Sequence, residues 1–271
     1  MHKLAFSALP IVLAVTGSVA LIRPGFEEPG CACITPPSLA EVARLTAIAE
    51  DAKNPEALSA TGQLYFAYLQ RGDNKQAEIW KARAIAFGEP HTLYWVGDSI
   101  MVAVSAERDP LKQIAMLGQA IELFRKAEPL RDMLRDGERR AYVDEFRAAQ
   151  GTLAILREGL EPWIAKAKSG DATAAHHVAA YYFYGHLDQD RRTAWEDRAA
   201  RLGDPGFAWS FACCWRETRS ELLQGKRVIQ IAKANRKAWA GAGDGWSQRV
   251  LAKDLDAAES EIDSQLSKLH R

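Results

Sequence analysis

The sequence predicts an all-α fold, an α/α solenoid built from antiparallel helix pairs. First, no stretch shows sustained apolar and polar alternation, and no Asn-Gly or Asp-Gly turn joins β-branched runs, so strands are not expected. Second, every proline after residue 37 follows an acidic residue or Asn, which is the order typical of a helix start. Third, residues 80–94 and 195–209 match each other at a constant offset of 115 residues, which indicates an internal repeat.

Residues 1–22 have the composition of a secretory signal peptide. Leu4 to Ile22 carries no charge and is rich in Leu, Val and Ala, and Ser18-Val19-Ala20 supplies small residues at a suitable cleavage position. The alternative is an uncleaved anchor, because the apolar run approaches the roughly 20 residues that span a bilayer. Both interpretations export the rest of the chain, so we expect a periplasmic protein. Membrane contact is expected only if residues 4–22 are retained.

Residues 23–37 are expected to be extended, because four prolines disfavour helix there. This segment also contains the first pair of the four cysteines, which are Cys31, Cys33, Cys213 and Cys214. In an exported chain an even number of cysteines favours disulfides, here between the extended segment and the later helix. Three pairings are open, and buried free thiols are the alternative.

The helical domain is expected to cover residues 38–271. Ser38 and Glu41 form a capping box that opens the first helix. Six further starts are predicted at the acid-Pro or Asn-Pro pairs, whose prolines are Pro55, Pro90, Pro110, Pro129, Pro162 and Pro205.

The clearest repeats are residues 54–88 and 170–203. In each, a Trp is expected to fill the space between paired helices, an Ala lets them approach, and a Gly ends the second helix in a left-handed conformation. The repeat positions are Tyr65, Trp80, Ala84 and Gly88 in the first copy, with Pro90 just after it, and Tyr182, Trp195, Ala199 and Gly203 in the second copy, with Pro205 just after it. Residues 107–169 fit this pattern poorly and are either a diverged repeat or an inserted helical hairpin.

Composition and motifs point away from catalysis and from nucleic acid. Lys plus Arg and Asp plus Glu number 35 each, so no overall field attracts nucleic acid. The sequence contains no phosphate loop, dinucleotide fingerprint or Gly-x-Ser-x-Gly motif. Among the six histidines, His186 with Asp188 and Asp190 is the best cluster of metal-ligand types, but a polar loop explains these residues without a metal. We therefore expect no catalytic, cofactor or metal site, although two carboxylates that meet only in space would leave a diverged hydrolase open.

The second copy resembles the SEL-like repeat, a relative of the tetratricopeptide repeat. The resemblance rests on Gly170-Asp171-Ala172, Ala179-Ala180-Tyr181-Tyr182, Gly185 and Arg198-Ala199-Ala200-Arg201-Leu202-Gly203. It covers about 80 residues well, and the loops depart from the family's Gly-x-Gly-Val stretch. It implies a solenoid that binds a protein partner. It also suggests an envelope immunity protein that neutralises a secreted toxin of the type VI system, or else a general periplasmic scaffold or assembly factor.

Four aromatic residues after the acid-Pro pairs are the candidate partner-binding residues: Tyr94, Trp95, Trp209 and Trp215. Trp and Tyr are frequent anchors in protein interfaces. The alternative is that they fill space between repeats.

Overall fold

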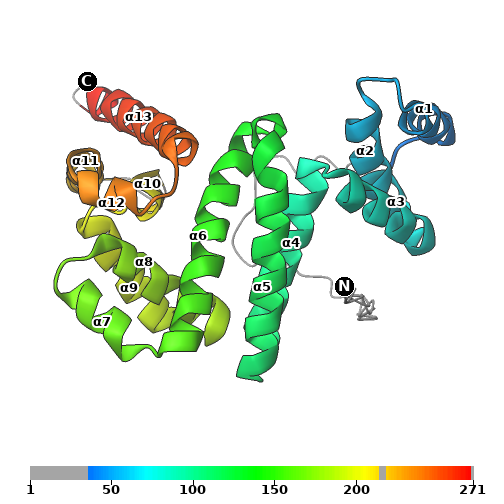
Figure 1. Ribbon diagram of the computed structural model, residues 1–271. Helices are drawn as coiled ribbons and strands as arrows, with labels where there is room; N and C mark the ends of the chain where they lie inside the picture. Colours follow the sequence, from blue (N-terminus) through cyan, green and yellow to red (C-terminus); the bar gives the residue numbers. More distant parts are fainter. Residues whose placement is uncertain (1–35, 214–217, 270–271) are drawn as a thin grey trace, which may run out of the picture. The chain divides into compact units, whose positions relative to one another are not determined.

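A computed structural model describes residues 36–213 and 218–269. Over these residues the chain forms only helices, which confirms the all-α prediction (Figure 1). The α-helices are α1 (Leu39–Glu50), α2 (Ala57–Gln70), α3 (Asn74–Phe87), α4 (Pro90–Ala106), α5 (Pro110–Ala127), α6 (Asp136–Glu158), α7 (Glu161–Lys168), α8 (Ala172–Ala180), α9 (Gln189–Arg201), α10 (Pro205–Cys213), α11 (Arg219–Ala234), α12 (Arg236–Ala240) and α13 (Gly245–Lys268). A 3₁₀ turn covers Glu128–Met133, and a π-helical turn covers Tyr181–Gly185.

Several predictions fall outside this part of the chain. The signal segment, the extended segment up to residue 35, Cys31, Cys33, Cys214 and Trp215 all lie outside the described residues. Cys213 ends α10, but its side chain is also outside the description. Within the described ranges, no helix is both long and apolar enough to cross a membrane.

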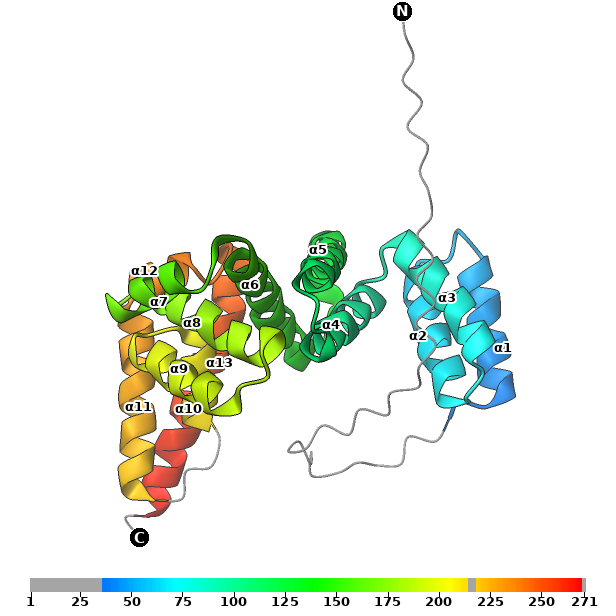
Figure 2. The same cartoon turned by 90° about the horizontal axis from the view of Figure 1, so that it is seen from below.

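Neighbouring helices pack as hairpins. Helix α1 packs on α2, α2 on α3, α4 on α5 and α8 on α9, as Figures 1 and 2 show. The 23-residue helix α6 packs on α5 and also on α8. Residues 107–169, which fit the repeat poorly, therefore contain the helix that supports the second copy of the repeat.

The acid-Pro rule locates most of the helix starts that it predicts. Pro90, Pro110 and Pro205 are the first residues of α4, α5 and α10, and Pro162 lies in the first turn of α7. The rule is wrong at Pro129, which lies in the 3₁₀ turn that continues α5 rather than opening a new helix.

At Pro55 the predicted start is displaced by two residues. The side chain of Asn54 accepts a hydrogen bond from the Glu56 N–H, which forms a turn, and α2 begins only at Ala57.

The two copies of the repeat have the same local structure. Helices α2, α3 and α4 begin at residues 57, 74 and 90, and α8, α9 and α10 begin at 172, 189 and 205. Each pair of starts differs by the 115 residues found in the sequence. Gly88 and Gly203 both have the left-handed conformation, with φ of 81° and 90°. The backbone N–H of the acid that follows each glycine donates to the carbonyl of Ala84 or Ala199, a Schellman arrangement.

The remaining repeat positions lie in the helix cores or at their edges. Trp80, Ala84, Ala199 and Tyr182 are buried, whereas Tyr65 and Trp195 are half-buried. Trp80 belongs to a core shared by α1, α2 and α3, and Trp195 packs against the core beneath α8.

The largest core lies among α4, α5, α6 and the C-terminal helices. Phe124 is fully buried at its centre, and its ring lies against Tyr94, Tyr142 and Phe146. The Tyr142 hydroxyl donates to the carbonyl of Phe124 at 2.9 Å, so a polar contact also fixes α6 to the end of α5.

Candidate functional site

Trp95 is the predicted partner-binding residue that the structure places at the surface. It lies in the second turn of α4 and is 43% exposed, whereas Tyr94 beside it is buried. The Trp95 ring packs edge-on against Phe66 of α2, with ring centroids 6.3 Å apart. An exposed indole that contacts two helices is therefore held in one orientation.

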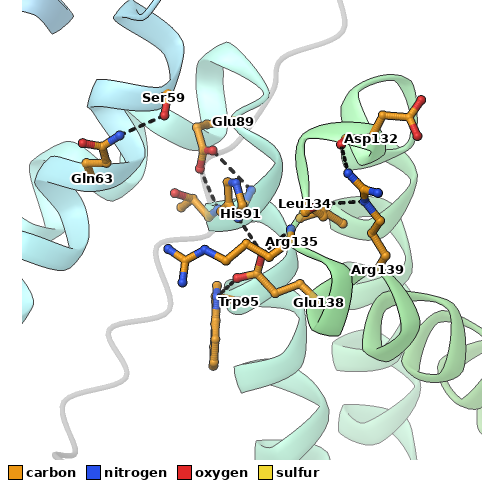
Figure 3. A network of polar contacts seen from close by, with 11 residues as sticks. Ser59, Gln63, Glu89, His91, Trp95, Asp132, Leu134, Arg135, Glu138 and Arg139 are labelled. Atoms are coloured by element: carbon orange, nitrogen blue, oxygen red, sulfur yellow. Dashed lines mark hydrogen bonds and ion pairs between the residues drawn. The ribbon is translucent and has the colours of Figure 1, made fainter. Parts of the chain in front are cut away.

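A carboxylate from α6 fixes Trp95 further (Figure 3). Glu138 points toward α4, where its Oε1 accepts from the Trp95 indole Nε1 at 3.1 Å and its Oε2 contacts the His91 Nδ1 at 2.8 Å. Glu138 Oε2 also accepts from the backbone N–H of Arg135, the residue that precedes α6. One carboxylate thus caps its own helix and joins it to α4.

The His91–Glu138 contact shifts both ionisations. The hydrogen bond to Glu138 raises the pKa of His91, although burial acts in the opposite direction. Burial alone would raise the pKa of Glu138, but the hydrogen bonds from His91 and the Arg135 N–H outweigh it and lower the pKa to about 2. The charge of Glu89 also raises the pKa of His91, whereas the charge of Arg135 lowers it.

These shifts predict a window of pH in which the pair stabilises the fold. The contribution of Glu138 is present above its unfolded pKa of about 4.5 and is lost as the pH falls towards 2. The contribution of His91 is present below its unfolded pKa of about 6.5 and is lost as the pH rises through the folded value. We expect the difference in free energy of unfolding between the wild type and His91→Gln to be largest between about pH 4.5 and 6.5.

Urea unfolding of both proteins from pH 4 to pH 9 measures this difference. The matched control is His186→Gln, which makes the same substitution at an exposed histidine just before α9. A His91→Gln difference that stays constant with pH would show that the ion pair is not formed.

The N-terminus of α4 is capped by a buried carboxylate, that of Glu89. Glu89 is 1% exposed, and its Oε2 accepts from the Thr92 N–H at 2.7 Å while its Oε1 accepts from the His91 N–H. Its side chain lies so close to Gly62 of α2 that a Cβ at residue 62 would collide with it. The missing side chain of Gly62 thus makes room for the cap of α4.

The equivalent carboxylate in the second copy, Asp204, lies in a cluster of buried charges. Asp204 is fully buried and caps α10 by accepting from the Phe207 N–H at 3.1 Å. Its Oδ2 pairs with Arg147 Nη2 of α6 at 2.5 Å, and its Oδ1 lies 3.3 Å from His176 Nδ1 of α8. Burial alone would raise the pKa of Asp204, but Arg147 and His176 outweigh it and hold the pKa far below its usual range.

His177 completes this cluster without carrying charge. Its ring packs against Trp163, with centroids 5.0 Å apart, and against the backbone of α6 at Gly151, where a Cβ would overlap the ring. Burial lowers the pKa of His177 to about 3, so the ring is neutral at physiological pH. His177 therefore acts as a packing residue between α6 and α8.

The other predicted aromatic residues have different surroundings. Tyr94 lies in the main core, and the centroid of its ring is 5.6 Å from that of the Trp95 ring. Trp209 is half-buried, and the guanidinium of Arg140 lies 3.4 Å above its ring. The structure thus leaves Trp95 as the exposed member of the set among the residues that it describes.

Sequence reasoning did not identify Glu138, His91, Arg147 or Asp204 as interacting residues. The pairs His91–Glu138 and Arg147–Asp204 are 47 and 57 residues apart, and their partners in α6 lie outside the matching repeats. One sequence signal pointed to Asp204 as a structurally important acid: Glu89 and Asp204 occupy the same repeat position.

The structure also bears on metal and catalytic chemistry. In the described ranges, no three His, Cys, Asp or Glu side chains converge in a way that would hold a metal ion. Asp144 and Glu145 of α6 line a pocket beside His176, and burial raises the pKa of Asp144. The absence of catalysis therefore stays a prediction.

No protein-family model, curated protein or solved structure matches this chain, so the resemblance to the SEL-like repeat also stays a prediction.

Proposed function

We propose that this chain is a non-enzymatic protein-binding scaffold of helical hairpins, with Trp95 as an anchor for the partner. The supporting observation is that Trp95 is substantially exposed and yet held by Glu138 from α6 and by Phe66 from α2. A large side chain that is already ordered loses little conformational entropy on binding, which is the property of interface anchors.

The proposal has two further parts that rest on the sequence. The composition of residues 1–22 supports export to the periplasm. The resemblance to the SEL-like repeat supports an immunity protein whose partner is a secreted toxin, and a general periplasmic scaffold or assembly factor is the alternative. An immunity function predicts a single stoichiometric complex with one toxin, so the experiment below tests that function first.

Replacing Trp95 with alanine should weaken the binding of the partner. The wild-type chain, immobilised and exposed to an envelope extract of the source organism, is expected to retain one protein in stoichiometric amount. Trp95→Ala is expected to weaken that complex by about 2 kcal/mol or more, roughly thirtyfold in Kd, because truncation of an anchoring Trp removes its buried contact. Calorimetry with the purified partner measures the change.

The matched control is Leu111→Ala in α5, which removes an apolar side chain that is 76% exposed. It should bind as the wild type does, and circular dichroism should show both variants folded. A partner that binds Trp95→Ala with wild-type affinity would contradict the role of Trp95. Recovery of several envelope proteins in place of one toxin would favour the general scaffold.

A further inference from the structure

The surface that α2 and α4 form around Trp95 has no exposed Asp, Glu, Lys or Arg. Helix α2 contains none of these residues, and α4 contains Asp98, which is only 7% exposed. Helices α3 and α5, which pack on α2 and α4, each carry several charged residues. Charged residues make up 26% of the chain, so composition alone does not explain the uncharged surface. Depletion of charge is a feature of the centre of protein interfaces.

Both helices present side chains to this surface at the same spacing. In α2 these are residues 59, 63, 66 and 70, and in α4 they are residues 95, 99, 102 and 106, a spacing that keeps them on one side of each helix. The two sides meet where the rings of Phe66 and Trp95 lie with their centroids 6.3 Å apart. We call this surface the α2–α4 face. Its members are all exposed or half-buried: Ser59, Gln63, Phe66, Gln70, Trp95, Ser99, Val102 and Ala106.

An exposed arginine lies at the edge of the α2–α4 face. Arg135 immediately precedes α6, and its backbone N–H donates to the carboxylate of Glu138. Its side chain extends toward α4 (Figure 3), and its charge is close enough to His91 to lower the pKa of that ring. Within the part of the chain that the structure describes, the guanidinium of Arg135 has no ion pair or hydrogen bond, whereas Arg139 and Arg140, which follow it in α6, both form ion pairs. Arg135 is therefore available to a partner.

The carboxylates near Arg135 are turned toward the protein. The two oxygens of Glu138 contact the Trp95 indole N–H and the His91 ring, and its side chain is only 13% exposed. Glu89 is 1% exposed, and its oxygens accept from N–H groups in the first turn of α4. The His91 side chain is 22% exposed and adds positive charge when it is protonated. A molecule that covers Trp95 would therefore meet the guanidinium of Arg135 as the most exposed charge.

The α2–α4 face and Arg135 together define the chemistry of a partner segment. A free guanidinium pairs well with a carboxylate, which it can bind through two parallel N–H groups. The rings of Trp95 and Phe66 offer apolar surface to an aromatic or aliphatic side chain. The amide groups of Gln63 and Gln70 can both donate and accept hydrogen bonds, which suits the backbone of an extended peptide.

The same distribution of charge disfavours nucleic acid as the occupant. Binding to a phosphate backbone depends on several cations acting together, because each neutralised phosphate adds to the affinity. The described residues place one unpaired cation, Arg135, beside an otherwise uncharged surface. An acidic segment of a protein needs only one such charge.

We propose that the α2–α4 face binds an acidic segment of a partner protein, in which an Asp or Glu pairs with Arg135 and an aromatic or large aliphatic side chain lies against Trp95 and Phe66. Trp95 and Arg135 are neighbours because both donate to Glu138. Residues two apart in an extended segment point to the same side and are about 7 Å apart, so we expect the acid about two positions from the apolar residue. This inference rests on the proposed function, because it names the kind of segment that Trp95 would hold.

Selection from a random peptide library tests the chemistry of the segment. The full chain is immobilised and exposed to random dodecapeptides displayed on phage. We expect the enriched peptides to share an Asp or Glu about two positions from a Phe, Trp, Tyr or Leu. Enriched peptides that lack such an acid, or no enrichment at all, would overturn the proposal.

Titration of the most enriched peptide identifies the residue that pairs with its acid. The peptide is synthesised with a fluorescent label, beside an analogue in which Gln or Asn replaces the acid, and binding is followed by fluorescence anisotropy. The wild-type chain should bind the analogue about fivefold more weakly, the size expected for a single exposed ion pair. Arg135→Gln should bind the peptide and the analogue equally, because the guanidinium is gone, whereas Arg135→Lys should keep most of the difference because it keeps the charge.

The matched control is Arg157→Gln. Arg157 is also exposed and lies in the last turn of the same helix, roughly 30 Å from Arg135 at the helical rise per residue. It should keep the wild-type preference for the acidic peptide, and circular dichroism should show each variant folded. A preference that persists in Arg135→Gln, or that disappears equally in Arg157→Gln, would contradict the role of Arg135.

Trp95→Ala distinguishes this inference from the proposed function. Weaker binding of the selected peptides to Trp95→Ala, together with an unchanged preference for the acid in Arg135→Gln, would exclude the acidic segment and leave Trp95 as the anchor. Peptides that bind Trp95→Ala as tightly as the wild type would contradict both proposals.

Discussion

Replacing Arg147 with methionine should lower the free energy of unfolding by about 3–5 kcal/mol, because it leaves a fully buried carboxylate without its main counter-charge. Asp204 has no exposed surface, and Arg147 is 4% exposed. Arg147 also donates from Nε to the carbonyl of Gly241 at 3.2 Å, so the variant loses a second contact, with the segment that follows α12. Urea unfolding of the variant and the wild type at pH 7 measures the difference.

Two further variants separate the cost of leaving a buried charge unpaired from the cost of losing any ion pair. Arg201→Met removes an ion pair with Asp197 whose side chains are both about half exposed, so we expect a change below about 1 kcal/mol. The double variant Arg147→Met with Asp204→Asn should recover part of the loss, because it removes the charge that the first substitution strands. A single-variant cost as small as that of Arg201→Met would show that water reaches Asp204.

Truncating Phe124 to alanine should cost about 3–5 kcal/mol, the range for a large aromatic side chain removed from a packed core. The ring is fully buried and lies 5.8 Å from both Tyr142 and Phe146 of α6. It also packs directly on the backbone of α4, where a Cβ at Gly97 would lie 2.7 Å from it. Its loss therefore opens a cavity that three helices border.

Phe87→Ala provides the matched control for the same chemical change. Phe87 ends α3 and is 64% exposed, so its truncation should change the free energy of unfolding by no more than about 0.5 kcal/mol. Thermal and urea unfolding should agree in the order of the two variants. Equal costs would mean that the main core does not depend on Phe124.

The sequence was sufficient to predict the repeated helices because their signals are local. A glycine in the left-handed conformation, a capping acid and a proline occupy adjacent positions, and each acts on the backbone within one turn. Gly88 and Gly203 therefore indicate the same helix end in the two copies of the repeat. The prediction was wrong at Pro129 because a proline is also compatible with a 3₁₀ turn that extends an existing helix.

The candidate sites were less predictable because they depend on contacts between distant elements. Trp95 was singled out as an aromatic residue after a helix start, but its exposure depends on how closely α2 approaches α4. The carboxylate that orients it, Glu138, is in the part of the chain that fits the repeat poorly. Asp144 likewise becomes a pocket residue only because α6 packs against α8 and α10, which no local pattern encodes.

Helices α1, α2 and α3 share a core of their own, and this has a consequence for how the molecule opens. That core contains Leu64 and Trp80. Its contacts with the α4 region include the close approach of Glu89 to Gly62 and the ring contact between Phe66 and Trp95. A group of helices with its own core can unfold locally at lower free energy than the whole chain. A molecule bound over Trp95 and Phe66 would contact both sides of this boundary and protect the amide hydrogens of the first three helices from exchange with solvent.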